Sequence, residues 1–330
     1  MIDVDFIIPW VDGGDPAWRE QMERYRGAFT VMTDSSGSRY RDWDNLRYWF
    51  RGVEKFAPWV RTVHFLTWGH LPPWLDTRHP KLHIVRHEDF IQREYLPVFS
   101  SHPIELSMHR IEGLAERFVY FNDDTFLLRP VGTERFFRGG LPCDNARLNI
   151  IPPSSIAHIV LNDVELINLR HDKRQAVRRN SSKWFNCRYS LPDILKTLTL
   201  MPWSVFAGFK DSHMPQPYLR TTFEKMWAEE GDRLAGTMHS RFRNVLDYNQ
   251  YLMRYEQLVT GRFAPVSMRD CRLDTLGGES IGRISDMITA QKYAMISLND
   301  SEMITDFEGI KCRLNAAFEK ILPDKCSYEL

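Results

Sequence analysis

At residues 118–124 the protein reads Phe118-Val119-Tyr120-Phe121-Asn122-Asp123-Asp124, and Thr125-Phe126-Leu127-Leu128 follows. A short continuous apolar run that ends in a polar turn is typical of a buried strand near the centre of a sheet. Ligands of open α/β sheets bind where such strands end. Paired carboxylates at that edge suit a divalent cation that in turn holds a phosphate. A strand that simply ends in an Asx-type turn explains the same residues, so both interpretations stay open on this stretch alone.

The composition is that of an ordinary globular protein. The 330 residues are 43% hydrophobic and 26% charged, and 43 Lys and Arg residues balance 43 Asp and Glu residues. This length suits one large α/β domain, or one domain with a sizeable insertion. A formal net charge of zero argues against binding to nucleic acid through bulk positive charge.

The five cysteines are scattered along the chain and form no C-x-x-C motif. They therefore predict neither a zinc site nor a disulfide framework, and a reducing compartment is the simpler expectation. No signal peptide is visible at Met1-Ile2-Asp3, and no apolar run approaches the length that crosses a bilayer. We expect a cytoplasmic protein.

Strands and helices alternate in the first 130 residues. Apolar runs and helical spacing of apolar residues predict strands over 5–11, 63–67 and 82–85 and helices over 17–25 and 46–57. This order indicates a parallel sheet built from crossover connections. The Ser-, Gly- and Asp-rich residues 33–40 predict a mobile loop.

The turn after the first strand is acidic and rich in glycine. It reads Asp12-Gly13-Gly14-Asp15-Pro16, and Pro16 suits the first turn of the following helix. A strand, such a turn and a helix make a plausible nucleotide-binding unit, although neither G-x-G-x-x-G nor a P-loop is present. A simple connection between strand and helix is the alternative.

Two pairs of polar residues lie on predicted helices. Arg47 and Arg51 are four residues apart, which suits either a clamp for an anion or a solvated helix face. Glu105 and His109 are one turn apart in a helix predicted from residue 101 or 102 through residue 117. They therefore share a face and can reach a common ligand, unless they form a surface ion pair.

The regular alternation fades after Pro130, and the second half is mostly helical. Helices are predicted over 156–170, 192–201, 216–230 and 245–258. We expect residues 136–279 to form a helical insertion, or lid, over a core made of 1–135 and 280–330. The basic run over 170–179 suits an anionic acceptor, a membrane surface or a solvated helix face.

A strand predicted over 293–298 ends at Asn299-Asp300, which repeats the arrangement at Phe118–Asp124. A final helix is predicted over 301–321. If this last strand returns to the sheet, Asn299 and Asp300 lie on the same carboxyl edge as Asp12 and Asp124.

Four segments resemble, in order, the conserved regions of the Stealth family of sugar-1-phosphate transferases. They are Ile2-Asp3 through Pro16; Arg41 through Arg61 with Leu96 through Asp124; Ser212 through the Arg241 segment; and Leu298-Asn299-Asp300 with residues 322–329. We therefore expect an α/β, Rossmann-like and glycosyltransferase-A-like fold, in which a mostly parallel sheet is flanked by helices and carries a largely helical insertion.

The resemblance implies a UDP-hexose or UDP-N-acetylhexosamine donor and a glycan acceptor. An acceptor hydroxyl attacks the phosphorus nearest the sugar, UMP leaves, and a sugar-1-phosphodiester forms, as in the synthesis of capsules or cell-surface polysaccharides. This chemistry calls for a divalent cation, Mg²⁺ or Mn²⁺, on the diphosphate, and for a base on the hydroxyl. Peripheral association with the inner face of the membrane would fit such an acceptor.

The roles implied by the resemblance fall into three groups. Catalysis is assigned to Asp124, His213 and Arg241; donor binding to Asp12, Gly13, Arg47, His109 and Asn299; and metal binding to Asp123, Asp124, Glu105 and Asp300. Either Asp124 or His213 is the general base. The alternatives are a metal-dependent glycosyltransferase that moves only the sugar, and a carbohydrate-binding protein without activity.

Overall fold

The structure is a computed structural model that describes residues 2–26 and 41–330, so the loop expected over 33–40 lies outside the described residues. Its strands are β1 (Asp5–Trp10), β2 (Val63–Thr67), β3 (Leu82–Arg86), β4 (Arg117–Tyr120), β5 (Thr125–Leu127), β6 (Phe137–Arg138), β7 (Leu141–Asp144), β8 (Gln216–Leu219), β9 (Ala264–Pro265), β10 (Cys271–Thr275) and β11 (Met295–Asn299). Its α-helices are α1 (Pro16–Arg26), α2 (Leu46–Phe56), α3 (His87–Phe90), α4 (Ser101–Ser107), α5 (Ala157–Arg170), α6 (Lys173–Arg179), α7 (Ser181–Trp184), α8 (Leu191–Leu200), α9 (Arg220–Met238), α10 (Gln250–Val259), α11 (Ile281–Thr289) and α12 (Phe307–Ile321).

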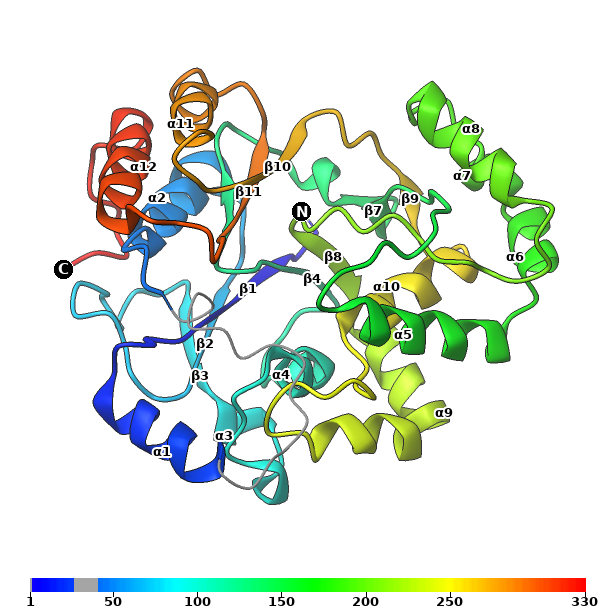
Figure 1. Ribbon diagram of the computed structural model, residues 1–330, viewed down its shortest axis with the longest axis horizontal. Coiled ribbons are helices and arrows are strands. Elements are labelled where there is room, and N and C mark those ends of the chain that lie inside the picture. The colour runs from blue at the N-terminus through cyan, green and yellow to red at the C-terminus, as the bar shows by residue number, and fades with distance from the viewer. Residues whose placement is uncertain (1, 27–40) are drawn as a thin grey trace.

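The central sheet has the strand order β3-β2-β1-β4-β8 (Figure 1). The first four strands in this order are parallel, and β8 runs antiparallel to β4 at the edge. The expected α/β fold with a mostly parallel sheet is thus confirmed. Because β1 and β4 are parallel neighbours, the residues that follow them meet at one edge of the sheet.

The two central strands are buried on both faces. Phe6 and Ile8 of β1 pack into one apolar cluster, whereas Ile7 between them packs into the cluster on the other face. Residues 118–121 alternate between the same two clusters. Burial of each large apolar side chain contributes about 1.5–3 kcal/mol, which explains why these runs carry no polar residue until the strands end.

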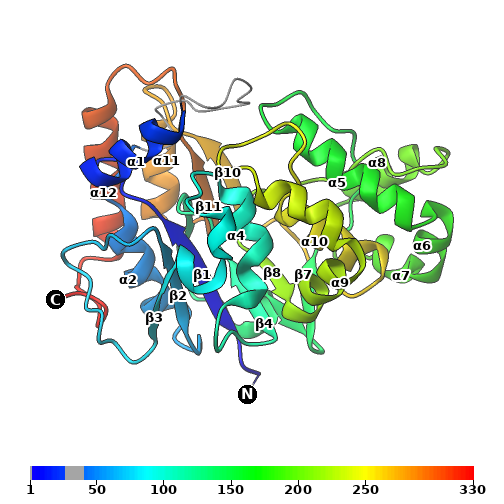
Figure 2. The same cartoon turned by 90° about the horizontal axis from the view of Figure 1, so that it is seen from below.

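Helices cover both faces of the sheet. α2, α11 and α12 pack on the side of Phe6, and α4, α5, α9 and α10 pack on the side of Ile7. Figures 1 and 2 show these two groups on opposite sides of β1. The segment with α6, α7 and α8 extends to the end of the molecule farthest from the C terminus in both views.

The last strand does not return to the central sheet, so this expectation is wrong. β11 lies in a separate sheet of order β10-β11-β5, in which it runs antiparallel to β5. The antiparallel register pairs Ser297 with Thr125 and lets Leu298 N donate to Asp124 O (3.0 Å). Asn299 and Asp300 therefore still reach the turn after β4, because β5 begins where that turn ends.

Three helix predictions differ at their ends. The helix over 101–117 ends at Ser107, continues as a 3₁₀ turn to Arg110, and stops before Gly113, whose φ of +72° suits glycine. The helix predicted from 245 begins only at Gln250, where the Asn249 side chain accepts from Tyr251 N. The last helix starts at Phe307, after its N-cap Asp306.

The helix predicted over 216–230 is wrong in its first four residues, which form β8. Pro217 disfavours a helix here, and it is tolerated in β8 because an edge strand leaves one row of N–H positions unpaired. β8 and β10 both lie within 136–279, and they join sheets formed by strands from outside that range. Among the described residues, no helix is both long and apolar enough to span a membrane.

Candidate active site

The turn that carries Asp123 and Asp124 is held by three strands. Thr125 N and Thr125 Oγ1 both donate to the carbonyl of Asn122, at 3.1 and 2.7 Å. The carbonyl of Asp124 accepts from Leu298 N of β11. β4, β5 and β11 thus fix the backbone of the turn, and the two carboxylates project from a rigid edge.

His213 binds Asp124 directly. Its Nε2 donates to Oδ2 of Asp124 at 3.0 Å, across 89 residues of sequence. His213 adopts a φ of +47°, in the left-handed region that non-glycine residues seldom occupy. Such a conformation persists where the surroundings hold it in place, and it is common at functional sites.

The pKa of His213 is raised above its ordinary value. Burial opposes protonation of the ring, but the charge of Asp124 and the hydrogen bond to it outweigh burial, with smaller contributions from Asp123 and Glu105. Oδ1 of Asp124 is buried and accepts no hydrogen bond from any described residue. One oxygen of this carboxylate orients the imidazole, and the other is left for a further positive or hydrogen-donating group.

The pKa of Asp123 is raised to about 7 by desolvation and by the adjacent charge of Asp124. His213 counteracts this shift, whereas the charge of Asp42 adds to it. Water reaches the exposed part of Asp123 and weakens the effect without changing its sign. Two carboxylates that disfavour each other's ionisation in this way favour a cation between them.

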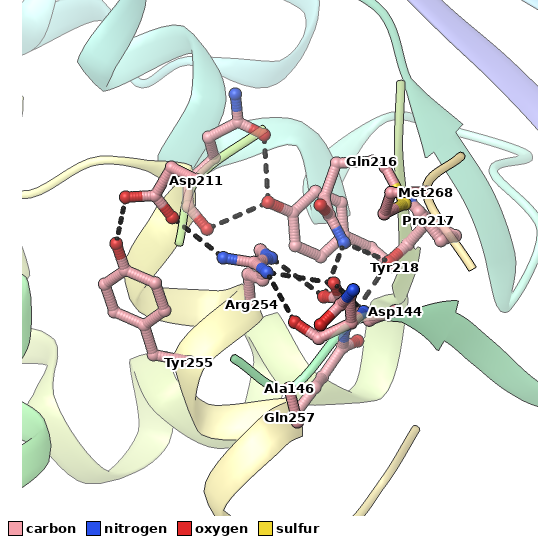
Figure 3. Close-up of polar contacts among 12 residues, drawn as sticks. Asp144, Ala146, Asp211, Gln216, Pro217, Tyr218, Arg254, Tyr255, Gln257 and Met268 are labelled. Carbon is pink, nitrogen blue, oxygen red and sulfur yellow. Dashed lines mark hydrogen bonds and ion pairs between the residues drawn. The ribbon is translucent and has the colours of Figure 1, made fainter. Parts of the chain in front are cut away.

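A buried ion network holds the loop of His213. Arg254 of α10 is 2% exposed and donates to both carboxylate oxygens of Asp144 at 2.8 and 2.9 Å, and to Oδ1 of Asp211 at 2.8 Å. Tyr255 donates to the other oxygen of Asp211 (2.7 Å). Figure 3 shows Arg254 between the two carboxylates. Because Asp211 lies two residues before His213, this network anchors the loop that places the imidazole.

Asp300 lies beside the segment that leads into α2. Its carboxylate accepts from Nη1 of Arg41 at 3.5 Å and from Nε1 of Trp43 at 3.3 Å. Desolvation raises the pKa of Asp300, and Arg41 opposes this. Asp42, between those two partners, is close enough to act on the pKa of Asp123. The 41–43 segment and the end of β11 thus border the carboxylate pair.

Asp12 and Gly13 follow β1 at the same edge of the sheet. Oδ1 of Asp12 accepts from Gly14 N (2.7 Å), and Asp12 N donates to Nε2 of His70 (2.7 Å). The carbonyl of Gly13 accepts from Arg19. These contacts shape the turn before α1, and the donor-binding role of both residues stays a prediction.

Glu105 and His109 do not converge on a common ligand. Glu105 is buried and accepts from Gln250 N (3.2 Å) at the start of α10 and from the Tyr120 hydroxyl (3.5 Å). The His109 ring stacks on Phe223 of α9, and burial, with the charge of Arg110, lowers its pKa to about 4. The contacts of these two residues are those of a helix cap and of an aromatic stack.

Arg47 and Arg241 lie in different surroundings. Arg47 contacts Asp44 (3.4 Å) at the start of α2. Arg241 donates to the Leu96 carbonyl (3.3 Å) and places its guanidinium over the Tyr25 ring, 5.0 Å from the centroid. Its Nε is buried and has no hydrogen-bond partner in the described part of the chain, which leaves a donor for an anion. Within the described part of the chain, neither arginine forms a hydrogen bond or an ion pair with Asp124.

The expected metal group of four carboxylates is not assembled. Within residues 2–26 and 41–330, no three His, Cys, Asp or Glu side chains converge on a metal-binding group. Asp123 and Asp124 nevertheless fit a cation that is shared with a substrate, because one oxygen of Asp124 is buried without a partner. Mg²⁺ is usually held by one or two carboxylates together with water and substrate phosphates.

Sequence reasoning missed two features of this site. Arg41 and Asp42, which border the site, lie in a segment that resembles the Stealth family, but the sequence analysis gave neither residue a role. The Asp144–Arg254–Asp211 network left a weak signal in the sequence, since a lone arginine in an apolar helix is usually solvated. Its burial against two acidic residues, 110 and 43 positions away in the sequence, is a property of the fold.

Comparisons with known proteins identify the family of this chain. Residues 3–30 match Stealth protein CR1, conserved region 1, and residues 39–143 match Stealth protein CR2, conserved region 2. The capsular polysaccharide phosphotransferase WcwK of Streptococcus pneumoniae is 38% identical over 100% of this chain and 98% of that protein. The receptor polysaccharide phosphotransferase WefC of Streptococcus oralis is 38% identical over 100% of both chains.

Among solved structures, the galactosyltransferase LgtC in complex with donor and acceptor sugar analogs matches with a TM-score of 0.38 and 9% identity, over 94% of this chain and 95% of that one. This likeness is too weak to carry an argument about the site. The two matched regions and the full-length identity to two phosphotransferases are sufficient to assign the family. The chain belongs to the Stealth family.

Proposed function

We propose that this enzyme transfers a hexose-1-phosphate, or an N-acetylhexosamine-1-phosphate, from a UDP-sugar to a hydroxyl of a glycan acceptor and releases UMP. The names of its relatives, capsular and receptor polysaccharide phosphotransferases, support the reaction class. The observation that carries the site assignment is the 3.0 Å contact between His213 and Asp124 at the carboxyl edge of the sheet.

The contact defines which ring nitrogen takes the proton. Nε2 of His213 donates to Asp124, so Nδ1 is the nitrogen with a free lone pair. In the proposed step, Nδ1 accepts the proton of the acceptor hydroxyl while that oxygen bonds to the phosphorus nearest the sugar. The bridging P–O bond breaks, and its electron pair leaves with UMP. Asp124 keeps the imidazole oriented and stabilises its protonated form.

The negative charge of the diphosphate would be neutralised by groups around His213 and Asp124. Asp123 and Asp124 would hold Mg²⁺ or Mn²⁺, which when bound neutralises phosphate charge. The buried Nε of Arg241, unpaired among the described residues, supports a phosphate contact. Asp12, Gly13 and Asn299 border the same edge and would contact the nucleotide or the sugar.

A reducing, cytoplasmic location is part of this proposal. All five cysteines are free thiols in the structure. Structural disulfides are common in oxidising compartments and rare in the cytoplasm.

The released nucleotide tests the proposed reaction. With a panel of UDP-sugars and a glycan acceptor, we expect UMP as the nucleotide product and a phosphodiester signal in the phosphorus NMR spectrum of the glycan. UDP in place of UMP would show a glycosyltransferase that moves only the sugar. Absence of any released nucleotide with every donor would indicate a carbohydrate-binding protein. The His213→Gln variant serves as the matched control for background hydrolysis.

The raised pKa of Asp123 makes cation binding dependent on pH. Below about pH 7 the carboxyl is protonated, and a cation must displace that proton. Affinity for Mn²⁺, measured by calorimetry without donor, should therefore rise about tenfold between about pH 6 and about pH 8. The Asp123→Asn variant should bind Mn²⁺ more weakly, and its affinity should no longer depend on pH. Asp286→Asn, on the surface of α11, should bind Mn²⁺ as wild type does. An unchanged pH dependence in Asp123→Asn contradicts the assignment.

A further inference from the structure

Helix α8 buries Asp193 and Thr197 together with Leu200, and it exposes three other leucines. Asp193 and Thr197 face inward, where Asp193 accepts from Nη1 of Arg147 (2.6 Å) and Thr197 Oγ1 accepts from Leu148 N (3.2 Å). Side chains facing outward are Leu191, Leu195 and Leu198, with exposed fractions of 66%, 52% and 48%. A surface helix of a globular protein normally shows the reverse arrangement.

The apolar exposure continues past the end of the helix. Trp203 is 57% exposed and Val205 is 49% exposed. Several large apolar side chains exposed on one short segment are a common feature of interaction surfaces. The inner face of α8 is anchored by the hydrogen bonds of Asp193 and Thr197 and by the buried side chain of Leu200.

The exposed charges around this helix are mostly positive. Across residues 169–205, the exposed basic side chains are Arg174, Arg178, Arg179, Arg188 and Lys196, and Asp172 is the one exposed carboxylate. The formal net charge of the whole chain is zero, so basic residues are concentrated on this segment. Figure 1 shows α6, α7 and α8 together at one end of the molecule.

We propose that this α8 surface, made of the exposed leucines of α8, Trp203, Val205 and the five exposed basic side chains, docks on an anionic lipid bilayer. Leucines that enter the boundary between headgroups and acyl chains, basic residues at the headgroups and a tryptophan at the interface are the features of a helix that lies on a membrane. The inference does not rest on the proposed reaction.

Other occupants fit the surface less well. A second copy in a two-fold contact would place the same basic side chains opposite each other, and like charges there disfavour association. A soluble anionic glycan would satisfy the arginines but would leave three leucines and a tryptophan in water. The bilayer accounts for both the charge and the apolar side chains.

Sedimentation with vesicles tests the proposal on the full chain. The wild-type protein should bind phosphatidylcholine vesicles that contain about 30% phosphatidylglycerol, and bind pure phosphatidylcholine at least tenfold more weakly. The combined variant Leu191→Ser/Leu195→Ser/Leu198→Ser should lose at least tenfold in partitioning to the anionic vesicles. Replacing Arg174, Arg178 and Arg179 by Ser should lower it about a hundredfold, with a flatter salt dependence.

Matched controls lie at the opposite end of the molecule, near the C terminus. Leu330→Ser removes a leucine that is 63% exposed, and Arg78→Ser removes an exposed arginine. Both should bind as wild type. If the triple leucine variant does not fold, as judged by its circular dichroism, the single Leu195→Ser variant should still lower partitioning severalfold.

Two results would overturn the proposal. One is equal sedimentation of wild type and both triple variants with anionic vesicles. The other is light scattering that shows a dimer in wild type and a monomer in the leucine variant, without vesicle binding by either, because the surface would then bind a second copy of the chain.

Discussion

The Asp124→Asn variant should release nucleotide about a thousandfold more slowly than wild type. The amide keeps the size of the carboxylate but removes the charge that stabilises protonated His213 across their 3.0 Å contact. It also removes half of the carboxylate pair that would hold a cation. Both losses act on the same step, so the effect should exceed that of any substitution that removes only one of them.

The fold should survive this substitution. Oδ1 of Asp124 accepts nothing from the described residues, and the charge of Asp124 raises the pKa of Asp123, so removal of that charge relieves a repulsion between the two side chains. The variant should therefore be at least as stable as wild type in a urea titration. Asp286→Asn, an exposed carboxylate on α11, is the matched control and should keep full turnover. Turnover of Asp124→Asn within tenfold of wild type would contradict the catalytic assignment.

The pH profile distinguishes loss of a base partner from loss of a metal ligand. In wild type, His213 acts as base only when deprotonated, so turnover should rise with pH through a pKa above the ordinary histidine value. Asp124→Asn removes the charge that raises this pKa and leaves at most a neutral, weaker hydrogen bond, whereas burial, which lowers the pKa, remains. The rising limb of the residual activity should move to lower pH. An unmoved limb would show that His213 is not the titrating group.

The central strands were readable from sequence because burial on both faces demands a continuous apolar run. β4 and the turn at Asp123–Asp124 follow directly from that requirement. The edge strand β8 was not readable, because it has four residues, contains Pro217 and leads directly into the helix that begins at Arg220. β11 was recognised as a strand, but its antiparallel partner β5 is only three residues long.

The residues of the site also differ in how far the sequence predicts them. Asp124 has a local signal, since it ends an apolar strand. The resemblance to the Stealth family indicated His213 as a candidate residue, but its contact with Asp124, 89 residues away in the sequence, was not predicted and is a property of the fold. Helical spacing wrongly grouped Glu105 with His109, because a 3₁₀ turn begins between them at Met108. Spacing rules hold only while the helix lasts.

Arg254→Met should cost about 3–5 kcal/mol of unfolding free energy. Arg254 is buried and binds Asp144 with two hydrogen bonds and Asp211 with a third. Methionine fills similar space but leaves two carboxylates buried without a counter-charge, and this unpaired state is the main source of the loss. The surface pair Arg283–Asp274 has similar bidentate geometry, at 2.6 and 2.8 Å, but is exposed. Arg283→Met should leave the free energy of unfolding almost unchanged, because solvent screens an exposed ion pair.

The sign of the pH dependence identifies the cause of this loss. Burial already raises the pKa of Asp211 to about 6 although Arg254 opposes it, and removal of the arginine raises it further. When the pKa of a carboxyl is higher in the folded than in the unfolded state, the folded state loses stability as the pH rises and the carboxyl ionises. The unfolding free energy of Arg254→Met should therefore be closest to that of wild type at acidic pH. The difference between the two should grow as the pH rises through about 6 and above.

Adding Asp144→Asn and Asp211→Asn to Arg254→Met should flatten that dependence and recover part of the stability, because no buried charge then lacks a partner. Turnover should stay low in the triple variant, since the loop that places His213 has lost its ionic anchor. Urea titrations across this pH range measure the first effect, and nucleotide release measures the second. A pH-independent loss in Arg254→Met would mean that packing, and not the unpaired carboxylates, sets the cost.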